Sequence, residues 1–518
     1  MNELERQKRL AIADAVDAVH AGRMARREFL RLCALAGVSL GSMAAIGACR
    51  QRDPDRWRER AHGTGGAHAE RVAAATASTI GADEERFLEV IGERFKGAKL
   101  VIVAEDSPST RAAVQLTRSE FMPLTGIEVT WERFSLERVL ARVSSATARE
   151  SPSCDIFYLD QAWVGTFYQD TVDPKELLQK NELAYPNYNF SDLLPALVIK
   201  AASYQGQAIG IPFDIPIQIL QYRRDIFEEL GLAPPTTMDA YLEAVSAIHE
   251  AKAPQITGTV GQWRAGHYSL VIEAASWLWA HGGAFFGADE RSCLTDEAAY
   301  ASMRYMLDLG RYMPPEAMTY SWDGQARAIA EGRAAMMIGA SEWLSLFDDP
   351  AHSQVVGLVE VAPCPRELAL RSPLECGFDE TPGISRQGGS CLAISRYSQQ
   401  IDAAWVFLQW ATSADVTTRA SLLGGGSPIR RSNYDDPRVR AAAKVQIGTT
   451  RHFDVTLDAI EHRMGTEPHL PAWAQLVEEH LAVELGKMTT GQQNISTTLA
   501  RMADASNMLS QAGRRGAR

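Results

Sequence analysis

Three side chains that can bind a small polar molecule stand directly after a strand-like run. Asp160, Gln161 and Trp163 follow residues 155–159, DIFYL, whose apolar pattern is typical of a buried strand. Carboxylate and amide oxygens accept hydrogen bonds from hydroxyl groups, and an indole ring packs against C–H faces. Ligands collect beyond the carboxyl ends of strands in open α/β sheets, which favours a binding role here. A helix cap beside a half-buried tryptophan is the alternative interpretation.

Two further segments place polar groups beside predicted strand ends. Asp106 and Ser109 follow the run 99–104 and open a predicted helix, whose backbone N–H groups and hydroxyls could face a ligand. Plain N-capping by a serine is the alternative. Phe213 and Asp214 lie where the chain turns between two extended pieces. A buried aspartate there would accept hydrogen bonds from hydroxyl groups, whereas a simple turn aspartate is the alternative.

Aromatic rings are the second ingredient of such a site, and ten of the eleven tryptophans lie in the part of the chain predicted to fold. Trp343 follows a strand-like run and Trp473 opens a helix; the family resemblance given below is what implies that both stack on a ligand. Trp405 and Trp410 lie on an amphipathic helix and are expected in the core. Weaker candidates for ligand contact are Trp263, His267 and Tyr268.

The part of the chain that is predicted to fold carries none of the common catalytic motifs. After residue 48 the sequence contains no Gly-x-Ser-x-Gly, no His-Glu-x-x-His and no Gly-x-x-x-x-Gly-Lys-Ser/Thr, and no cysteine pair has zinc-ribbon spacing. We therefore expect a protein without catalytic residues, metal or cofactor. Acidic residues are abundant, so a glycan hydrolase or lyase with two carboxylates flanking the scissile bond stays the alternative.

The elements that must position these residues alternate between strand and helix. Strand-like runs at 99–104, 127–132 and 155–159 are separated by helical patterns at 110–121 and 136–143. This βαβαβ order predicts an α/β fold with a parallel sheet covered on both faces. Further strand-like runs lie at 209–212, 217–222, 334–339 and 355–361.

Residues 1–48 are predicted to be an export signal. An arginine pair within residues 26–31 precedes the uncharged run 32–48, which is short and weakly apolar for a membrane span but suits a signal peptide. The run ends Ile-Gly-Ala before Cys49, a sequence typical of a lipobox, so Cys49 is the predicted lipidation site. The arginine pair followed by Phe-Leu resembles a twin-arginine signal. General export and an uncleaved anchor helix are the alternatives.

The lipidated cysteine and a polar tether are predicted to occupy residues 49–95, because the segment after Cys49 is rich in polar residues and glycine and lacks periodicity. No later segment is apolar enough to cross a membrane. Two later cysteines, Cys364 and Cys376, either close a short loop through a disulfide or remain unpaired.

Length and charge narrow the function further. The 518 residues exceed the usual size of one compact domain. Net charge is −12, and without residues 1–48 there remain 45 basic and 59 acidic residues, a net charge of −14. Such an acidic chain is not expected to bind nucleic acid through phosphate contacts.

Four segments, in order, resemble the family 1 extracellular solute-binding proteins of ABC importers, the group that includes maltose-binding proteins. The first has a Tyr-basic-Asp-Phe motif followed by Gly-Leu and Pro-Pro-Thr-Thr, and the second has a buried strand followed by Ser-Glu-Trp. The third has a strand that begins after Gly-Gly and leads into a helix with two tryptophans, and the fourth is a Pro-Ala-Trp helix start. The segments are 222–237, 331–343, 388–413 and 471–473. Together the resemblance extends from about residue 99 to the end.

The resemblance implies two α/β lobes with a ligand cleft between them. Lobe one would comprise 96–216 and 389–432, and lobe two 220–387 and 435–518. The candidate residues named above would then hold a sugar, oligosaccharide or polyol, and closure would deliver it to the importer's permease subunits. A non-sugar solute is the alternative.

A hinge and a location follow from the same resemblance. Gly388 and Gly389 would form the hinge, because glycine permits unusual backbone angles; an ordinary turn is the alternative. The protein would lie outside the cytoplasm, held to a bacterial membrane by the lipid on Cys49.

Overall fold

The computed structural model of the protein describes residues 80–365, 370–424, 426–443 and 451–516. The predicted export signal, Cys49 and most of the predicted tether lie outside these ranges. Within them, no helix is long and apolar enough to span a membrane.

A five-stranded sheet forms the centre of what we call lobe one. β1 (Lys99–Glu105) pairs in parallel with β2 (Glu128–Phe134) and β3 (Ile156–Asp160), as the βαβαβ pattern predicts. β11 (Ser390–Ile394) runs antiparallel to β3 and to β6 (Ile211–Asp214). The predicted parallel sheet is therefore mixed, because a strand from far along the chain inserts between β3 and β6. In spatial order the strands are β2, β1, β3, β11 and β6.

The order of these strands creates a crevice at their carboxyl ends. The chain passes from β1 to β2 on one side and from β2 to β3 on the other. Right-handed crossovers then place helices α6 (Pro108–Leu116) and α8 (Leu136–Thr147) on opposite faces of the sheet. Ligands bind at such a reversal, which here lies beyond the ends of β1 and β3.

Helix α6 begins where the sequence provides a cap. Ser107 Oγ accepts a hydrogen bond from the Thr110 N–H at 3.1 Å, and Pro108 occupies the first helical position. The helical pattern predicted at 110–121 continues as a π-helical turn, Thr117–Phe121, and the short α7 (Met122–Thr125). The start of α6 is thereby held at the carboxyl end of β1.

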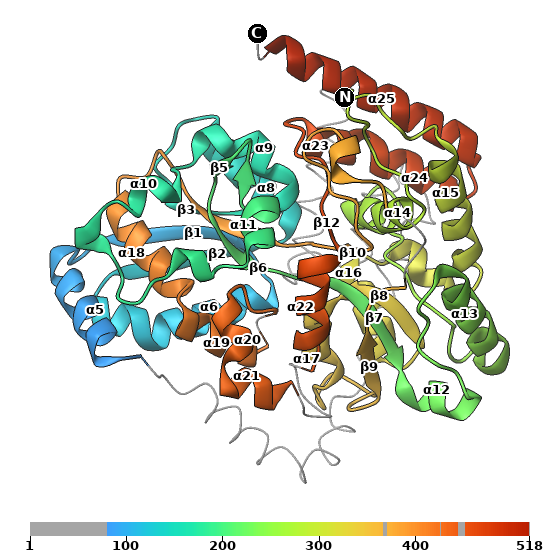
Figure 1. The fold of residues 1–518 in the computed structure, drawn as a ribbon, viewed down its shortest axis with the longest axis horizontal. Helices are drawn as coiled ribbons and strands as arrows, with labels where there is room; N and C mark the ends of the chain where they lie inside the picture. The colour runs from blue at the N-terminus through green and yellow to red at the C-terminus, as the bar shows by residue number, and fades with distance from the viewer. Residues whose placement is uncertain (1–79, 366–369, 425, 444–450, 517–518) are drawn as a thin grey trace, which may run out of the picture. The chain divides into compact units, whose positions relative to one another are not determined.

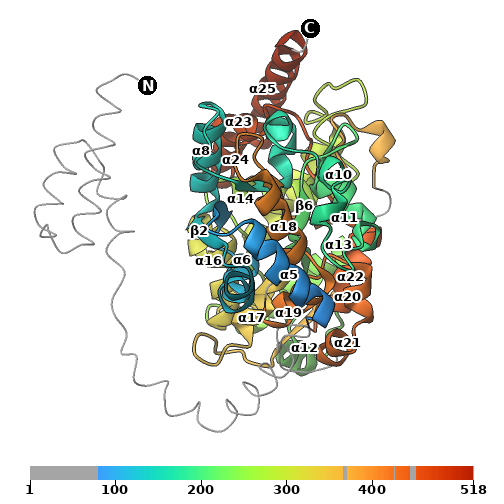
Figure 2. The same cartoon turned by 90° about the vertical axis from the view of Figure 1, so that its left-hand side faces the viewer.

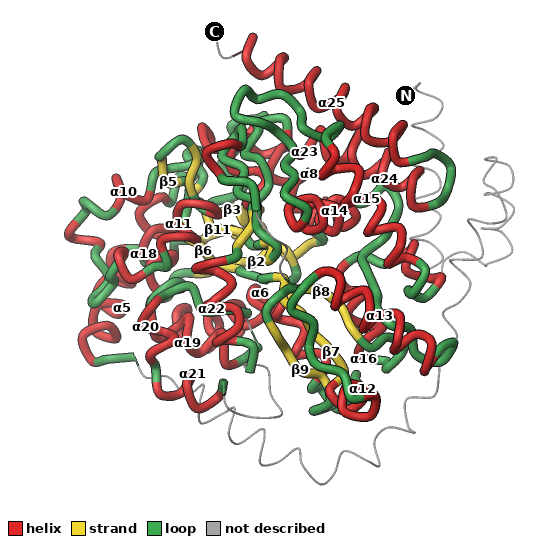
Figure 3. The backbone as a smooth tube through the Cα atoms, turned by 45° about the vertical axis from the view of Figure 1, so that its right-hand side comes forward, coloured by secondary structure: helices red, strands yellow, loops and turns green. Residues whose placement is uncertain are grey.

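An antiparallel three-stranded sheet forms the centre of lobe two. Its order is β8 (Met336–Ala340), β7 (Gln218–Arg223) and β9 (Val359–Ala362). Only three residues separate the end of β6 from the start of β7, so the two sheets meet at this first crossing between the lobes. Figure 1 shows β1, β2 and β3 at the left and β7, β8 and β9 at the lower right, and Figure 3 shows the strands in yellow.

Helices cover both sheets, and those predicted at 236–250 and 268–281 are present as α13 and α14. The longer helices are α11 (Pro195–Ala201), α12 (Arg224–Leu230), α13 (Met238–Lys252), α14 (Tyr268–Ala280), α15 (Glu297–Gly310), α16 (Trp322–Ala330), α18 (Ile401–Ala411), α19 (Ala414–Leu422), α22 (Phe453–His462), α24 (Ala482–Thr489) and α25 (Ile495–Gly516). Shorter elements are β4 (Ser203–Tyr204), β5 (Gln207–Ala208), α9 (Val164–Phe167), α10 (Pro174–Leu177), α17 (Leu344–Phe347), β12 (Met464–Gly465) and α23 (Trp473–Leu476).

Helix α5 (Ala82–Arg94) occupies the second half of the predicted tether, 49–95. Leu88 and Ile91 on one face of α5 are buried, and the helix packs against α7 of lobe one. Figure 2, which faces lobe one, shows α5 in front. The tether prediction is wrong for this helix, because its apolar face makes it part of lobe one.

Lobe one also extends past the boundary predicted at residue 432. α20 (Arg431–Asp435) leads into α21 (Pro437–Ala442), which packs on α19. The Arg438 guanidinium donates to Asp415 Oδ1 of α19 at 3.3 Å. Residues 437–442 therefore belong with lobe one and not with lobe two, to which the sequence assigned them.

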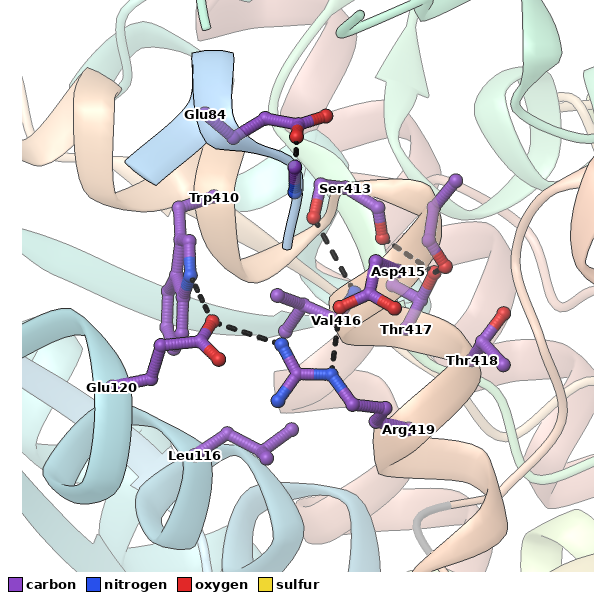
Figure 4. Close-up of polar contacts among 12 residues, drawn as sticks. Glu84, Leu116, Glu120, Trp410, Ser413, Asp415, Val416, Thr417, Thr418 and Arg419 are labelled. Atoms are coloured by element: carbon purple, nitrogen blue, oxygen red, sulfur yellow. Dashed lines mark hydrogen bonds and ion pairs between the residues drawn. The ribbon is translucent and has the colours of Figure 1, made fainter. Parts of the chain in front are cut away.

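A buried ion pair fastens α19 to the π-helical turn inside lobe one (Figure 4). Arg419 Nη2 donates to Glu120 Oε1 at 2.8 Å, and its Nε donates to Asp415 Oδ2 at 2.7 Å. Trp410 Nε1 donates to the same Glu120 oxygen at 3.0 Å. These hydrogen bonds compensate the desolvation of the two buried charges. Trp410 and Trp405 are fully buried, which confirms that both belong to the core.

Cysteines in the described ranges are all free thiols. Cys364 is buried and its thiol donates to the Gln218 carbonyl at 3.4 Å, while Cys376 is partly exposed. Of the two alternatives for this pair, the unpaired state is the one observed.

Candidate functional site

A cavity of about 330 Å³ lies where the carboxyl ends of the lobe-one strands face lobe two. Its wall mixes hydrogen-bonding groups with flat rings, a combination that suits a polar solute with apolar faces. The lining includes the carboxyl groups of Glu105, Asp106, Asp160, Asp214, Asp323 and Glu342, the guanidinium groups of Arg111 and Arg386, the amides of Gln218 and Gln262, and the rings of Tyr268, Trp322 and Trp343.

Three strand ends bring Glu105, Asp160 and Asp214 to one edge of the lobe-one sheet. Ser390 of β11 is in register with Asp160 on one side and with Asp214 on the other, so the two aspartates are separated by one strand. Asp160 is 2% and Asp214 1% exposed. Both carboxyl groups are therefore largely removed from bulk water while they line the cavity.

The Tyr158 hydroxyl connects two of these carboxyl groups. It lies 3.2 Å from Glu105 Oε2 and 3.0 Å from Asp214 Oδ2, and Ser109 Oγ donates to Asp214 Oδ1 at 2.7 Å. One hydroxyl hydrogen serves only one of the two carboxylates. Burial and the Asp214 charge raise the pKa of Glu105 to about 8, and burial raises the pKa of Asp214. A protonated Glu105 that donates to Tyr158 satisfies this arrangement near neutral pH.

The Asp160 carboxyl group both caps a helical turn and lies on the cavity wall. Its Oδ1 accepts the Ala162 N–H at 2.8 Å, which caps the short helical turn after β3. Burial raises the pKa of Asp160 to about 7, and the neighbouring Arg386 opposes that rise. The helix cap predicted as an alternative to ligand contact is thus present, and it leaves the carboxyl group on the cavity wall.

Lobe two contributes Glu342 and Trp343, which follow β8 directly. Glu342 is 7% exposed, and neither its Oε2 nor the Trp343 Nε1 has a hydrogen-bond partner among the described residues. Burial and then the Asp214 and Glu105 carboxyl groups raise the pKa of Glu342 well above its usual value. A Cβ on Gly426, where φ is 85°, would lie 3.7 Å from Glu342 Oε2 and 3.9 Å from Asp214 Oδ1. The two carboxyl groups therefore approach each other from opposite lobes.

Arg386 ends the two-residue strand β10 (Ser385–Arg386) and is 2% exposed. Its Nη2 donates to Glu467 Oε2 at 2.6 Å and to the Tyr268 hydroxyl at 2.7 Å. Gln161 Nε2 of lobe one donates to the same Glu467 carboxylate. Glu467 thus compensates the buried guanidinium charge and joins the two lobes at the back of the cavity.

Four of the predicted ligand-binding residues line the cavity, namely Asp106, Asp160, Asp214 and Trp343. Asp106 differs from the others because its side chain is half exposed at the rim. It lies 2.9 Å from Arg133 Nη1 and 3.4 Å from Arg111 Nη1, so its charge is already paired.

Four other predicted residues lie behind the cavity wall, namely Ser109, Gln161, Phe213 and Trp263. Ser109 and Gln161 hydrogen-bond to Asp214 and Glu467, as described above. Phe213 stacks on Trp131 with 6.1 Å between ring centroids. Trp263 is buried in lobe two, where a Cβ on Gly310 would collide with its ring. Ser109 and Gln161 therefore support the site through their partners, whereas Phe213 and Trp263 belong to the packing of their lobes.

Trp163 and Trp473, the remaining two, line a separate cavity of about 20 Å³. This space is close to the size of one water molecule. It shares Tyr268 and Trp322 with the larger cavity. Trp473 is fully buried and packs edge-to-face on Phe285, with ring centroids 4.9 Å apart.

Gly388 and Gly389, the predicted hinge, lie in the segment that leads from β10 to β11. This segment runs beside the one that connects β6 to β7. The Gly388 N–H donates to the Pro216 carbonyl at 3.0 Å, and a Cβ on Gly389 would lie 2.1 Å from the Asp214 carbonyl oxygen. Neither glycine has a positive φ. Glycine is therefore required at 389 by close backbone approach, and not by the unusual backbone angles we expected; the hinge role itself stays a prediction.

Glu105, Glu342 and Arg386 were missed by sequence reasoning. Glu105 is next to the predicted residue Asp106, and Glu342 is next to the predicted residue Trp343. Their position at a strand end was the only sequence signal that could have identified them as binding residues. Arg386 lies in a two-residue strand that no periodicity reveals.

The cavity wall offers groups for polar contacts and for ring stacking. Among the described residues, no group of three or more His, Cys, Asp or Glu side chains is arranged to hold a metal ion. The carboxyl groups instead provide acceptors for hydroxyl or ammonium donors, and the rings cover apolar faces.

Comparison with known proteins adds family evidence. Residues 117–447 match the family described as bacterial extracellular solute-binding protein. The chain is 21% identical over 356 residues to the probable amino-acid ABC transporter periplasmic-binding protein y4oP of Sinorhizobium fredii, covering 67% of this chain and 75% of that protein. It is 27% identical over 279 residues to the mannitol-binding protein of Pseudomonas aeruginosa, covering 52% and 61%.

Solved structures share the fold. An ABC transporter solute-binding protein from Agrobacterium radiobacter, in complex with ribitol, superposes with a TM-score of 0.70 at 22% identity, covering 80% of this chain and 99% of that one. Maltose-bound MalE3 of T. maritima gives a TM-score of 0.68 at 20% identity, covering 80% and 100%. These likenesses confirm the two-lobed periplasmic-binding-protein-like fold.

Proposed function

Since this chain belongs to the bacterial extracellular solute-binding proteins, we propose that it captures a sugar or polyol between its lobes and presents it to an ABC importer. The observation that carries the proposal is the cavity of about 330 Å³ whose carboxyl groups and aromatic rings come from both lobes. A polyhydroxylated solute offers a donor to each acceptor and C–H faces to the rings.

The relatives support the solute class. One is a mannitol-binding protein, and structural neighbours were solved with ribitol and with maltose. Their known role is binding, which favours a binding protein over the alternative glycan hydrolase or lyase.

Export and anchoring complete the proposal. Residues 1–48 would direct the chain out of the cytoplasm, and the lipid on Cys49 would hold it at the membrane beside the permease subunits. The support is the lipobox pattern that ends at Cys49.

A thermal-shift screen against sugars, polyols, amines and anions tests the proposed function. A ligand at 100 times its Kd stabilises the folded protein by about 2.7 kcal/mol. We expect stabilisation by a sugar or polyol, and the solute should be recovered chemically unchanged after incubation. Consumption of the solute would instead support the enzyme alternative.

A further inference from the structure

The charges around the cavity do not balance. Both guanidinium groups on its wall already have carboxylate partners: Arg111 lies 3.4 Å from Asp106, and Arg386 lies 2.6 Å from Glu467. The described residues therefore leave no uncommitted cation on the cavity wall. Buried carboxylates without a counter-charge are strongly disfavoured.

Three carboxyl groups carry this imbalance, namely those of Glu105, Asp214 and Glu342, which we call the acidic trio. None of them forms an ion pair with any residue that the structure describes. Glu105 and Asp214 share the Tyr158 hydroxyl, and Glu342 approaches Asp214 from lobe two beside Gly426. A solute held in the cavity therefore meets the trio from both lobes.

Unpartnered polar atoms elsewhere on the wall show what else a solute must offer. Gln262 Oε1, on a side chain that is 3% exposed, accepts no hydrogen bond and so requires a donor. Arg386 Nε and Trp343 Nε1 donate to nothing and so require acceptors. A neutral hydroxyl group answers either need. An ammonium group would in addition supply the counter-charge that the described residues do not give the trio.

We propose that the captured solute is a polyhydroxylated amine, an amino sugar or amino alditol, whose ammonium group lies among Glu105, Asp214 and Glu342 while its hydroxyl groups meet Gln262, Arg386 and Trp343. This inference rests on the proposed function and specifies its solute class. A metal ion does not fit, because no three such side chains in the described ranges are arranged as metal ligands.

The protonation of the trio agrees with this assignment. Burial raises the pKa of each member. The Asp214 charge adds to the rise for Glu105 and Glu342, and the Glu105 charge adds to the rise for Glu342. The surrounding groups are Tyr158, Asp160 and Glu137 around Glu105, Ser107 and Ser109 at Asp214, and Arg111 facing Asp214 and Glu342. An ammonium group beside these carboxyl groups would lower their pKa values and so favour the release of protons.

Matched pairs of solutes test the proposal on the unmodified protein. Ribitol is compared with 1-amino-1-deoxyribitol, and D-mannitol with 1-amino-1-deoxy-D-mannitol, by calorimetric titration near pH 7. Charge-assisted bonds to buried carboxylates should make each amine bind about tenfold or more tightly than its parent. N-acetylation, which removes the charge, should abolish the preference. Titration in two buffers of different ionisation enthalpy should reveal proton release for the amine alone.

One variant and a matched control locate the ammonium group. Glu342→Gln should lower the affinity for the amine more than the affinity for the parent polyol, which reduces the preference severalfold. Glu316→Gln makes the same charge change on an exposed residue of lobe two and should leave the preference unchanged. If Glu342→Gln does not fold, Glu105→Gln takes its place.

Each outcome is decisive. Parents that bind as tightly as their amines would overturn the cationic solute and leave the proposed function intact. A preference for amines that survives Glu342→Gln and Glu105→Gln would overturn the assignment to the trio. Failure of every sugar, polyol and amine to bind would overturn the proposed function itself.

Discussion

His267 Nε2 lies 2.7 Å from Glu137 Oε1, and the two residues belong to different lobes. His267 caps α14 in lobe two, and Glu137 lies in the first turn of α8 in lobe one. The Ser269 N–H donates to His267 Nδ1 at 3.1 Å, so Nε2 carries the hydrogen and donates it to the carboxylate. This bond lowers the pKa of Glu137 to about 2. The pair therefore joins the lobes beside the cavity.

Loss of this inter-lobe bond should weaken solute binding. Glu137→Gln replaces the carboxylate with a weaker acceptor and should lower affinity about two- to fivefold, because half-exposed pairs contribute little. Stopped-flow fluorescence should show the change mainly as faster dissociation. Glu479→Gln, an exposed residue outside the cavity wall, is the control. Unchanged kinetics in both variants would show that the contact does not hold the lobes together.

Much of lobe one could be predicted because its signals are local. The runs 99–104, 127–132 and 155–159 alternate with amphipathic helical patterns, and they become β1, β2 and β3 with small changes at their ends. Asp160 and Asp214 were found for the same reason, since they stand at strand ends that apolar patterns reveal.

Long-range relationships could not be predicted in this way. β11 pairs with strands more than 150 residues earlier, and nothing local in its sequence shows that it runs antiparallel between them. Arg386 became recognisable only through its buried partner Glu467, which lies 81 residues away. α5 was missed because its short apolar stripe follows a long polar segment.

Trp343 and Asp160 should contact the solute from opposite lobes. Trp343→Ala removes ring contact worth about 1.5–3 kcal/mol, which is about tenfold or more in affinity. Asp160→Asn keeps an acceptor for the Ala162 N–H while it removes the carboxylate, and it should weaken binding by a similar factor. Calorimetric titration measures both variants.

Melting temperatures without solute provide the control for these two variants. They should stay near the wild-type value, because both side chains line the cavity and contribute little to either core. Wild-type affinity would remove the residue in question from the site, and a large loss of unliganded stability would assign it to core packing.

Unliganded protein should lose stability as pH rises from about 5 to about 8. The pKa of Glu105 is about 8 in the folded protein against an ordinary value of 4.5, so the folded state binds the extra proton in this range and stability falls with rising pH. Asp160 acts in the same direction up to about pH 7. Chemical denaturation across this range measures the slope, which Glu105→Gln should flatten. Stability that rises over the same range would contradict the buried acidic trio.

Cys49 should decide whether the protein stays at the membrane. Cys49→Ala removes the only predicted lipid attachment site, so the protein should be released in soluble form or remain as an uncleaved precursor. Cell fractionation with immunoblotting distinguishes these products from the mature membrane-bound form. The solute affinity of the variant should equal that of the wild type, since the lipid serves only as an anchor. A mature, membrane-bound C49A protein would contradict the lipobox assignment.

A crystal structure of the protein grown with the sugar, polyol or amino polyol that stabilises it most tests the central claim most directly. The account predicts one solute molecule in the cavity between the lobes, with hydroxyl groups on Asp160 and a C–H face on Trp343. An amino group, if the solute has one, should lie within about 3 Å of Glu342. A solute bound elsewhere on the protein, with this cavity filled only by water, would contradict it.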